Sequence, residues 1–487
     1  MHASYAPATE DTVTLRQRAR WLTADMDTPI SLFLGMARQE PGILLESAEV
    51  DGRWGRYSIL ACDILLSLSC RDGLLALDIR DSRLTPLRDL EGLPYVNGVR
   101  AAMRRLTLSA PDAADAPGTP ADLPPITRAL YGYFGYGMAG LFNPKPAAVL
   151  PPREAAACLV LPGTVLLFDH LYNRLCQLSL GEHRPVAGAH ATSCIAAPEA
   201  PAPDITAVPG EAGYKAAVQR IKELLRRGEA IQVVPSCNFS TPYAGDLFDL
   251  YRRMRRCNAS PYMFFMRLPE ITLFGSSPEV MVRCTAGRLQ LSPIAGTRRR
   301  GEDDAEDARL AAELREDPKE QAEHVMLVDL GRNDLGRIAR PGTIAVERLM
   351  EVEYFSHVMH LTSRITGRLR EDLDALDVLA STFPAGTVSG APKVRAMEII
   401  ADVEQRPRGP YAGCIGWLGL DKDSVHLDTG ITIRSMWFRD GRLHWQAGGG
   451  IVFDSDPDAE WREVRNKSAI MRTVLTTTGE HHVSSHR

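Results

Sequence analysis

The chain has 487 residues, of which 45% are hydrophobic and 24% are charged, and its formal net charge is −5. This length is enough for one large or two ordinary domains with a buried core, and the composition is that of an ordinary globular protein. The small negative charge gives no electrostatic reason to expect a nucleic acid or a membrane surface as a partner.

The distribution of apolar residues argues against membrane insertion and secretion. We find no apolar run of about 18 residues, which a transmembrane helix requires. The N-terminal segment lacks the apolar core of a signal peptide. The nine cysteines show no C-x-x-C pairing, so we expect reduced thiols, a cytoplasmic protein and no zinc site.

The predicted elements fall into two segments separated by a linker. Residues 11–194 mix short strand-like runs such as "GILLES" and "RYSILA" with one helical segment, "YVNGVRAAMRRLTL". Residues 195–210, rich in Ala and Pro, predict a linker. Residues 211–478 begin with an amphipathic helix that ends at Gly228. We therefore expect one domain on each side of the linker.

Within the second segment, helices alternate with strand-like runs that often follow one another directly. Examples are "ITLFGSS" followed by "EVMVRC", and "DTGITIRSMWF" followed by "RLHWQAGGGIVF". Consecutive strands of this kind are typical of hairpins rather than of βαβ units. The pattern favours an α+β fold with largely antiparallel sheets.

One predicted helix carries two acidic residues one turn apart. It begins at Asp317, which is a good N-cap, and Pro318 suits the first helical position. Glu320 stands at N3, where it can complete a capping box. Glu323 shares a helical face with apolar residues, so its carboxylate is expected to point toward apolar surroundings.

A second predicted helix, which begins at Asp456, repeats this arrangement. Glu460 and Glu463 lie three residues apart, and Lys467 follows four residues after Glu463. The two helices could converge on a hard divalent cation such as Mg²⁺. Alternatively, Glu320 only caps its helix, Glu460 compensates the helix dipole, and Glu463 pairs with Lys467 at the surface. The spacing alone leaves both interpretations open.

Glycine turns and isolated polar residues add further candidates. Gly448, Gly449 and Gly450 follow a strand, where backbone N–H groups can bind an anion, although such a run is more often only a turn. Arg434 interrupts an apolar strand and needs either a substrate carboxylate or a structural acid as its partner. His360 follows an apolar run, and a histidine in this setting is most often a core residue.

Other positions carry little information by themselves. Glu279 follows a proline and is also explained as the start of a strand, and Tyr411 is unremarkable alone. We find neither a G-x-S-x-G motif nor a nucleotide-binding glycine motif, and Cys414 does not complete a glutaminase-type nucleophile site.

Taken together, the motifs resemble a known family. The chain is similar to the chorismate-utilising enzymes, and most closely to the large, aminating subunit (component I) of anthranilate synthase, from about Leu44 to Leu475. The motifs that carry this resemblance occur in the following order: "LLES", "NASPYMFF", "SPIAGTRRRG", "EHVMLVDLGRNDLGRIA", "TVSGAPKVRAMEII", "GPYAGCIGW", "DTGITIRS" and "QAGGGIV". A series in fixed order is far more specific than any single motif, and it favours the metal interpretation of the glutamates.

The resemblance implies a fold and a reaction. The fold would be α+β, with two large, mostly antiparallel β-sheets packed together and helices on the outside. The reaction would be the Mg²⁺-dependent conversion of chorismate and ammonia to anthranilate and pyruvate, the first committed step of tryptophan biosynthesis. Because the chain shows no glutaminase triad, ammonia from glutamine would require a separate amidotransferase subunit (component II), which implies a hetero-oligomer.

The resemblance also assigns roles to residues. Glu323 and Glu463 match the Mg²⁺ ligands, with Glu320 and Glu460 close by. The positions that match substrate-binding residues are Gly296, Thr297, Tyr411, Arg434, Gly448, Gly449, Gly450 and Lys467. Three further positions match catalytic ones. Glu279 would protonate the departing C4 oxygen of chorismate, His360 would act in the step that loses pyruvate, and Thr387 would lie in the same pocket.

Two positions help to distinguish branches of the family. Ala295 stands where the aminodeoxychorismate synthase branch carries a lysine nucleophile. Gln232 stands where isochorismate and salicylate synthases carry a lysine that activates water. Since neither residue can play those roles, ammonia is the expected nucleophile. The alternatives are a synthase of 2-amino-2-deoxyisochorismate or of aminodeoxychorismate, and a non-catalytic tryptophan-binding relative.

The motifs "LLES" and "NASPYMFF" resemble the tryptophan feedback site of the family. The residues expected to bind L-tryptophan as an inhibitor are Glu46, Ser47, Asn258, Pro261, Tyr262 and Met263. Ala259 replaces a proline that is usual in this motif, and the replacement loosens a turn there.

Overall fold

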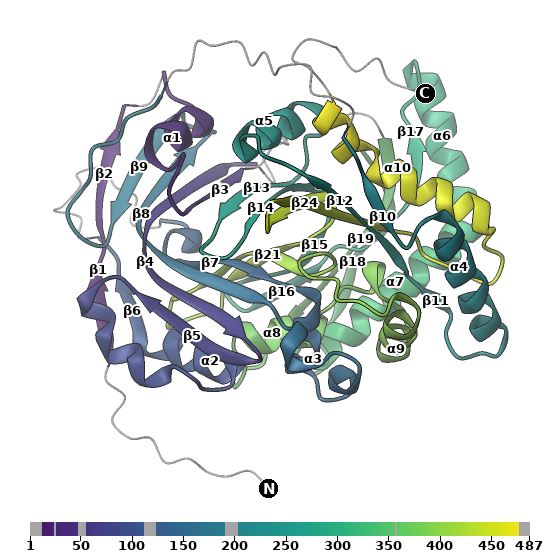
Figure 1. Ribbon diagram of the computed structural model, residues 1–487, viewed down its shortest axis with the longest axis horizontal. Coiled ribbons are helices and arrows are strands. Elements are labelled where there is room, and N and C mark those ends of the chain that lie inside the picture. The colour runs from purple at the N-terminus through teal and green to yellow at the C-terminus, as the bar shows by residue number, and fades with distance from the viewer. Residues whose placement is uncertain are drawn as a thin grey trace, which may run out of the picture.

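The structure is a computed structural model, and it describes residues 12–23, 26–46, 55–111, 123–189, 203–355 and 358–476. Within these ranges, twenty strands form one hydrogen-bonded network in which every strand pair is antiparallel. Two short pairs stand apart from the network: parallel β1 (Val13–Arg16) with β6 (Leu106–Ser109), and antiparallel β11 (Gln232–Val233) with β20 (Gly390–Ala391). The predicted α+β fold with mostly antiparallel sheets is confirmed (Figure 1).

The network has two arms that share two long strands, β4 (Tyr57–Arg71) and β8 (Ala157–Asp169). The first arm uses the N-terminal part of β4 and the C-terminal part of β8. On one side, the strands in spatial order toward β4 are β10 (Thr206–Val208), β12 (Ser236–Pro242), β24 (Arg442–Gly448), β23 (Ser435–Arg439), β14 (Thr272–Ser277), β13 (Tyr262–Arg267) and β3 (Gly42–Glu46). On the other side, β8 is followed by β9 (Arg174–Ser179) and then β2 (Arg18–Leu22).

The second arm uses the remaining parts of the same two strands. β5 (Leu74–Ile79) pairs with β4, and the other strands follow from β8. They are, in spatial order, β7 (Ala129–Phe134), β21 (Cys414–Gly419), β22 (Leu427–Ile431), β15 (Val280–Thr285), β16 (Arg288–Leu291), β19 (Val358–Arg368), and then β17 (Ile294–Arg299) and β18 (Ala345–Tyr354), which both pair with β19.

β4 and β8 pass from one arm to the other at matching points. The register between them shifts after Ile64, next to Asp63, which has a φ of 57°. Pro162 and Gly163 of β8 lie opposite, and a Cβ on Gly163 would come within 3.0 Å of the carbonyl oxygen of Asp63. A bulge bends a strand, and glycine permits this close backbone approach. Because of this bend, one pair of strands connects the two arms.

Side chains of the first arm alternate between two hydrophobic cores. Phe264 and Met266 of β13 belong to a core that also contains Ile415 of the second arm. Met263 and Phe265 belong instead to a core shared with helices. This alternation is the period of two expected of a strand that is buried on both faces.

Helices cover the outer faces of the two arms (Figure 1). Five of them contribute to the core on the first arm: α1 (Pro29–Met36), α4 (Glu211–Arg226), α5 (Leu247–Cys257), α9 (Lys393–Glu404) and α10 (Pro457–Thr476). The others pack on the second arm: α2 (Tyr95–Arg105), α3 (Ala139–Phe142), α6 (Asp304–Glu316), α7 (Pro318–Gly336) and α8 (Ala375–Thr382). The layers are therefore helix, sheet, sheet and helix, as expected.

Strands from both predicted domains lie in the same arms. β3 pairs with β13, and β7 pairs with β21, so residues from 11–194 and from 211–478 share hydrogen bonds. The domain boundaries stay a prediction. Of the predicted linker, only residues 203–210 are described, and they include β10. Among the described helices, none is long and apolar enough to cross a membrane.

Candidate active site

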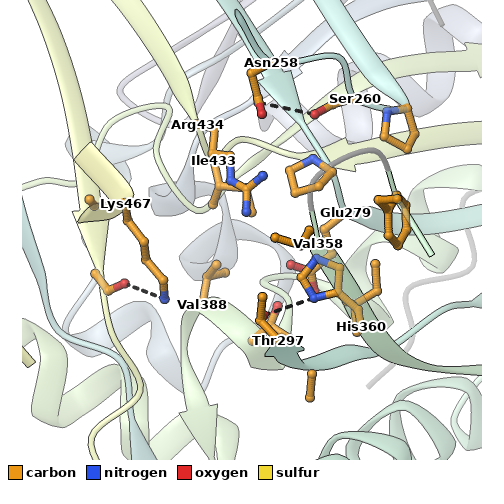
Figure 2. A pocket seen from close by; sticks show the side chains of 18 of the residues that line it. Asn258, Ser260, Glu279, Thr297, Val358, His360, Val388, Ile433, Arg434 and Lys467 are labelled. Atoms are coloured by element: carbon orange, nitrogen blue, oxygen red, sulfur yellow. Dashed lines mark hydrogen bonds between the residues drawn. The ribbon is translucent and has the colours of Figure 1, made fainter. Parts of the chain in front are cut away.

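A cavity of about 350 Å³ lies where strands of both arms end. The predicted site residues that line it are Asn258, Pro261, Glu279, Thr297, His360, Thr387, Tyr411, Arg434, Gly448 and Lys467. They come from β17, β19, β24, α10, the 3₁₀ turn η6 (Gly386–Val388) and the loops between strands. Figure 2 shows Glu279, His360 and Arg434 around one space, with Lys467 across from them. Positions that are up to about 200 residues apart in the sequence thus meet in one cavity.

Glu279 is an acid whose ionisation is controlled by burial. It stands between β14 and β15, where its carbonyl oxygen accepts a hydrogen bond of 3.0 Å from the N–H of Ile431. Burial raises the pKa of the Glu279 carboxyl to about 7, while Thr387, Lys467 and Arg434 oppose the shift. A carboxyl group with this pKa holds a proton that it can donate near neutral pH.

His360 of β19 is held in one orientation by β17. Its Nδ1 lies 2.9 Å from the carbonyl oxygen of Gly296. It also lies 3.0 Å from Oγ1 of Thr297, a contact drawn in Figure 2. A carbonyl oxygen can only accept, so Nδ1 carries the hydrogen and Nε2 has the free lone pair. Burial, aided by the charge of Arg434, lowers the pKa of His360 below its usual value, so the ring is neutral and can take up a proton.

Arg434 is a cation in the cavity with a strained backbone. Its φ is 47°, in the left-handed region, which costs a non-glycine residue about 1 kcal/mol or more. Burial lowers the pKa of its guanidinium, and the charge of Glu279 opposes this. Among the described residues, no carboxylate lies within ion-pair distance of the Arg434 guanidinium, in contrast to Arg283, Arg298 and Arg408. The guanidinium is therefore available for an anionic ligand.

The acidic helices predicted from the sequence are α7 and α10. Asp317 caps α7 by accepting from the N–H groups of Lys319 at 2.9 Å and Glu320 at 3.3 Å. Asp456 accepts from the N–H of Ala459 at 2.8 Å and so caps α10. Glu320 does not complete the expected capping box, because its carboxylate accepts from Arg298 Nη1 at 3.3 Å instead.

The four glutamates of these helices lie near one another at the edge of the cavity. Glu323 Oε1 accepts from Gln232 Nε2 at 3.3 Å, and Glu463 Oε1 lies 2.7 Å from Lys467 Nζ. Burial raises the pKa of Glu323, and the charges of Glu320 and Glu463 raise it further, although the Gln232 hydrogen bond opposes the shift. The carboxylates of the two helices therefore repel each other.

This arrangement fits a divalent cation that takes part of its ligands from elsewhere. The pKa of Glu460 is raised by burial and by Glu463, and its buried Oε2 has no hydrogen-bond partner among the described residues. Among the residues that the structure describes, no three or more His, Cys, Asp or Glu side chains lie close enough together to hold a metal ion by themselves. Mg²⁺ usually takes one or two carboxylates and completes its shell with waters and an anionic ligand.

Glycines let the two acidic helices approach the strands closely. A Cβ on Gly449 would lie 3.0 Å from Oε2 of Glu460, and one on Gly450 would lie 2.5 Å from the Gln232 amide. Gly296 has a φ of 66° and forms the bulge in β17. A Cβ on Gly296 would lie 3.0 Å from Oε2 of Glu320. Gly296 and Gly449 thus border the glutamates, Gly450 borders the Gln232 amide, and Gly448 lines the cavity itself.

A second cavity, of about 100 Å³, lies beside the first. Four of the residues predicted to bind an inhibitor line it: Glu46, Pro261, Tyr262 and Met263. Asn258 lines the first cavity instead, because its Nδ2 donates to Ser276 Oγ at 2.7 Å. Ser47 lies outside the described residues. Pro261 lines both cavities.

The second cavity contains an ion pair that the sequence analysis missed. Arg283 Nε lies 2.8 Å from Asp428 Oδ2, and the Tyr262 hydroxyl donates to Asp428 Oδ1 at 2.6 Å. Arg283 and Asp428 stand directly opposite each other in β15 and β22. The sequence shows opposite charges at these two positions, each in a run predicted to be a strand. It does not give the strand register that places the two side chains opposite each other.

Comparisons with known proteins point to enzymes that bind chorismate. The family model described as chorismate binding enzyme matches residues 96–473. The chain is 40% identical to "Anthranilate synthase component 1" of Streptomyces coelicolor over 93% of this chain and 87% of that protein. It is 38% identical to the protein of the same name from Thermus thermophilus, over 94% of this chain and 98% of that one.

Solved structures agree with this placement. The crystal structure of anthranilate synthase component I from Streptococcus pneumoniae matches with a TM-score of 0.66 at 29% identity, over 93% of this chain and 98% of that one. MenF, the menaquinone-specific isochorismate synthase from Escherichia coli, matches with a TM-score of 0.67 at 20% identity, over 96% of each chain, and shares the fold. The chain is therefore an enzyme of the chorismate-binding family and belongs with the anthranilate synthase component 1 proteins of that family.

Proposed function

We propose that this enzyme converts chorismate and ammonia to anthranilate and pyruvate with Mg²⁺. The observation that carries the proposal is the meeting of three groups in one cavity: a carboxyl group with a pKa of about 7 (Glu279), an imidazole whose Nδ1 is hydrogen-bonded (His360) and a guanidinium with no ion-pair partner among the described residues (Arg434). The names of the relatives support the same activity.

The cavity offers cationic and polar groups for a dianionic substrate. Arg434 and Lys467 line it with their positive ends, and the Lys467 ammonium is held by the carbonyl oxygen of Gly448 at 3.2 Å. Chorismate carries two carboxylates, so we assign its enolpyruvyl carboxylate to Arg434, with Tyr411 beside it. Glu323 and Glu463, with Glu320 and Glu460 near them, would hold Mg²⁺, which supplies a Lewis acid for the ring carboxylate.

The first step is the replacement of the C4 hydroxyl. Glu279 gives its proton to the C4 oxygen, which leaves as water, while ammonia forms a bond to C2 and the ring double bonds shift. The intermediate is 2-amino-2-deoxyisochorismate. Thr387 lies beside Glu279 and favours its ionised form after the transfer. Proton donation by a positioned acid of this kind contributes about 10²- to 10⁴-fold to a rate.

The second step makes the ring aromatic. Nε2 of His360 takes the proton from C2, the C3–oxygen bond breaks, and the enolpyruvyl group leaves as pyruvate after it takes up a proton. The hydrogen bond from Nδ1 to the carbonyl oxygen of Gly296 keeps the ring in the tautomer that this step needs.

Ammonia is the nucleophile that fits the residues near the substrate. Ala295 lines the cavity and has no amine to offer. Gln232, whose amide donates to Glu323, cannot act as a base for water. We propose that a glutamine amidotransferase subunit supplies the ammonia.

We also propose that the second cavity binds L-tryptophan as a feedback inhibitor. It is lined by Glu46 and by Pro261, Tyr262 and Met263, in agreement with the family motif. The Glu46 carboxylate accepts from Tyr251 at 2.6 Å and from Arg255 at 3.0 Å, so it is held in place for an ammonium group.

Purified chain with chorismate, Mg²⁺ and an ammonium salt is expected to form anthranilate and pyruvate in equal amounts. Mass spectrometry identifies the product, and anthranilate fluorescence gives the rate. Glutamine in place of ammonium is expected to give no product, because the sequence predicts no glutaminase triad. Accumulation of the amino intermediate would show that the enzyme stops after the first step.

Glu323→Gln and Glu463→Gln are each expected to lower Mg²⁺-dependent kcat by about 100-fold or more, since several kcal/mol of charge stabilisation are lost. Calorimetric titration with Mg²⁺ should show weaker binding in both. The matched control is Glu371→Gln, a change at an exposed glutamate that pairs with Arg340. Rates near that of the wild type in both test variants would exclude these residues as ligands.

The pH dependence of kcat/KM is expected to be bell-shaped. Glu279 must be protonated to act as the acid, so activity falls as the pH rises through its pKa of about 7. His360 must be neutral, so activity also falls as the pH drops through its lowered pKa. In Glu279→Gln the alkaline limb should vanish from the residual activity, and its persistence would assign the acid to another group.

Tryptophan is expected to inhibit the wild-type enzyme, and Glu46→Gln should raise the half-inhibiting concentration about tenfold or more. The reason is the loss of a charge-assisted contact to the amino group, which is worth about 1.5–3 kcal/mol. Inhibition is measured relative to the uninhibited rate of each protein. Equal sensitivity of the two proteins would contradict the placement of the inhibitor in this cavity.

A further inference from the structure

A buried ion pair lies directly behind the wall of the first cavity. Arg408 and Glu404 have side chains only 1% and 3% exposed, and they form a two-point contact, with Nε to Oε2 at 3.0 Å and Nη2 to Oε1 at 2.6 Å. Glu404 is the last residue of α9, and Arg408 precedes Tyr411 of the cavity by three positions. Neither Arg408 nor Glu404 lines the cavity.

Arg408 contacts three residues that do line the cavity. Its Nη1 donates to the carbonyl oxygen of Val388 at 2.9 Å, and its Nη2 donates to that of Val234 at 2.6 Å. Its guanidinium carbon also lies 5.6 Å from the ring centroid of Tyr411. Val234, Val388 and Tyr411 come from three separate segments, so one side chain connects three parts of the wall.

Glu404 connects a fourth part. Its Oε1 accepts from the N–H of Ser236 at 2.8 Å and from the Ser236 hydroxyl at 2.7 Å. The same hydroxyl accepts from Gln446 Nε2 at 2.6 Å, and Gln446 lines the cavity on β24, just before Gly448. The network thus reaches the strand end that borders Lys467 and the glutamates.

The attraction between the two charges does not by itself explain why these residues stand here. A buried ion pair can often be replaced by apolar residues without loss of stability, because removing two charges from water is costly. Only a guanidinium, however, presents donors in several fixed directions in one plane. This geometry lets Arg408 bind a carboxylate and two carbonyl oxygens at once. Because Glu404 neutralises it, the pair adds no net charge behind the substrate.

We propose that Arg408 and Glu404 are positioning residues that hold the walls of the chorismate cavity at the separation the reaction needs. The proposal rests on the proposed function, since chorismate is the ligand assigned to the cavity. A displacement of about 1 Å in such a wall can cost on the order of 10²-fold in rate.

The test is Arg408→Lys, which keeps the positive charge but has one nitrogen in place of three. We expect a folded protein whose kcat/KM for chorismate is lower by about 10- to 100-fold, with weaker chorismate binding in calorimetry. The control is Arg128→Lys, because Arg128 pairs with Asp421 at 2.9 Å and does not line this cavity. The control should bind chorismate like the wild type.

A second variant separates positioning from stability. Glu404→Met with Arg408→Met removes both charges and keeps an apolar filling. We expect a protein that still unfolds cooperatively, at a melting temperature lowered because backbone groups of Val234, Ser236 and Val388 lose their partners, and that binds chorismate weakly at temperatures where it is folded. Wild-type affinity and rates in Arg408→Lys or in the double variant would overturn the proposal, even if the melting temperature fell.

Calorimetry also distinguishes failure of the positioning role from failure of the proposed function. If the wild type binds chorismate but makes no anthranilate, the proposed function fails, and an affinity loss confined to the Arg408 variants still supports positioning.

Discussion

The partial burial of Glu279, His360 and Arg434 in the wall of the first cavity sets the direction in which the pKa of each group shifts. Burial disfavours the charged form of each group, so it raises the pKa of the acid and lowers the pKa values of the imidazole and the guanidinium. The acid therefore holds its proton near neutral pH while the histidine is free to accept one. The opposite proton-transfer roles that we propose for Glu279 and His360 thus follow from a single physical cause.

The packing of the two sheets provides this environment. β4 and β8 belong to both arms, so the strand ends that carry Glu279, His360 and Gly448 are held together by continuous hydrogen bonding. The acidic helices α7 and α10 then close on the edge of the cavity. Their carboxylates repel one another there, and the proposed cation would remove that cost.

The two cavities are joined by a short segment. Asn258 and Pro261 line the first cavity, and Pro261, Tyr262 and Met263 line the second. Tyr262 is tied to Asp428 and Arg283 of the second arm, and a ligand in the second cavity would contact the neighbouring Pro261, which also lines the first. This shared wall is the physical basis on which the proposed feedback by tryptophan would rest.

Local signals in the sequence were enough to predict the helix caps at Asp317 and Asp456, the hairpin-rich α+β class and, through ordered motifs, the family. Tertiary structure alone decided which groups meet. It paired Glu320 with Arg298 rather than with its own helix terminus, put Asn258 in the first cavity, and set Arg408 behind Val234, Val388 and Tyr411. Caps and periodicity depend on neighbours within about one or two turns, whereas these contacts depend on strand register and packing between segments far apart in the chain.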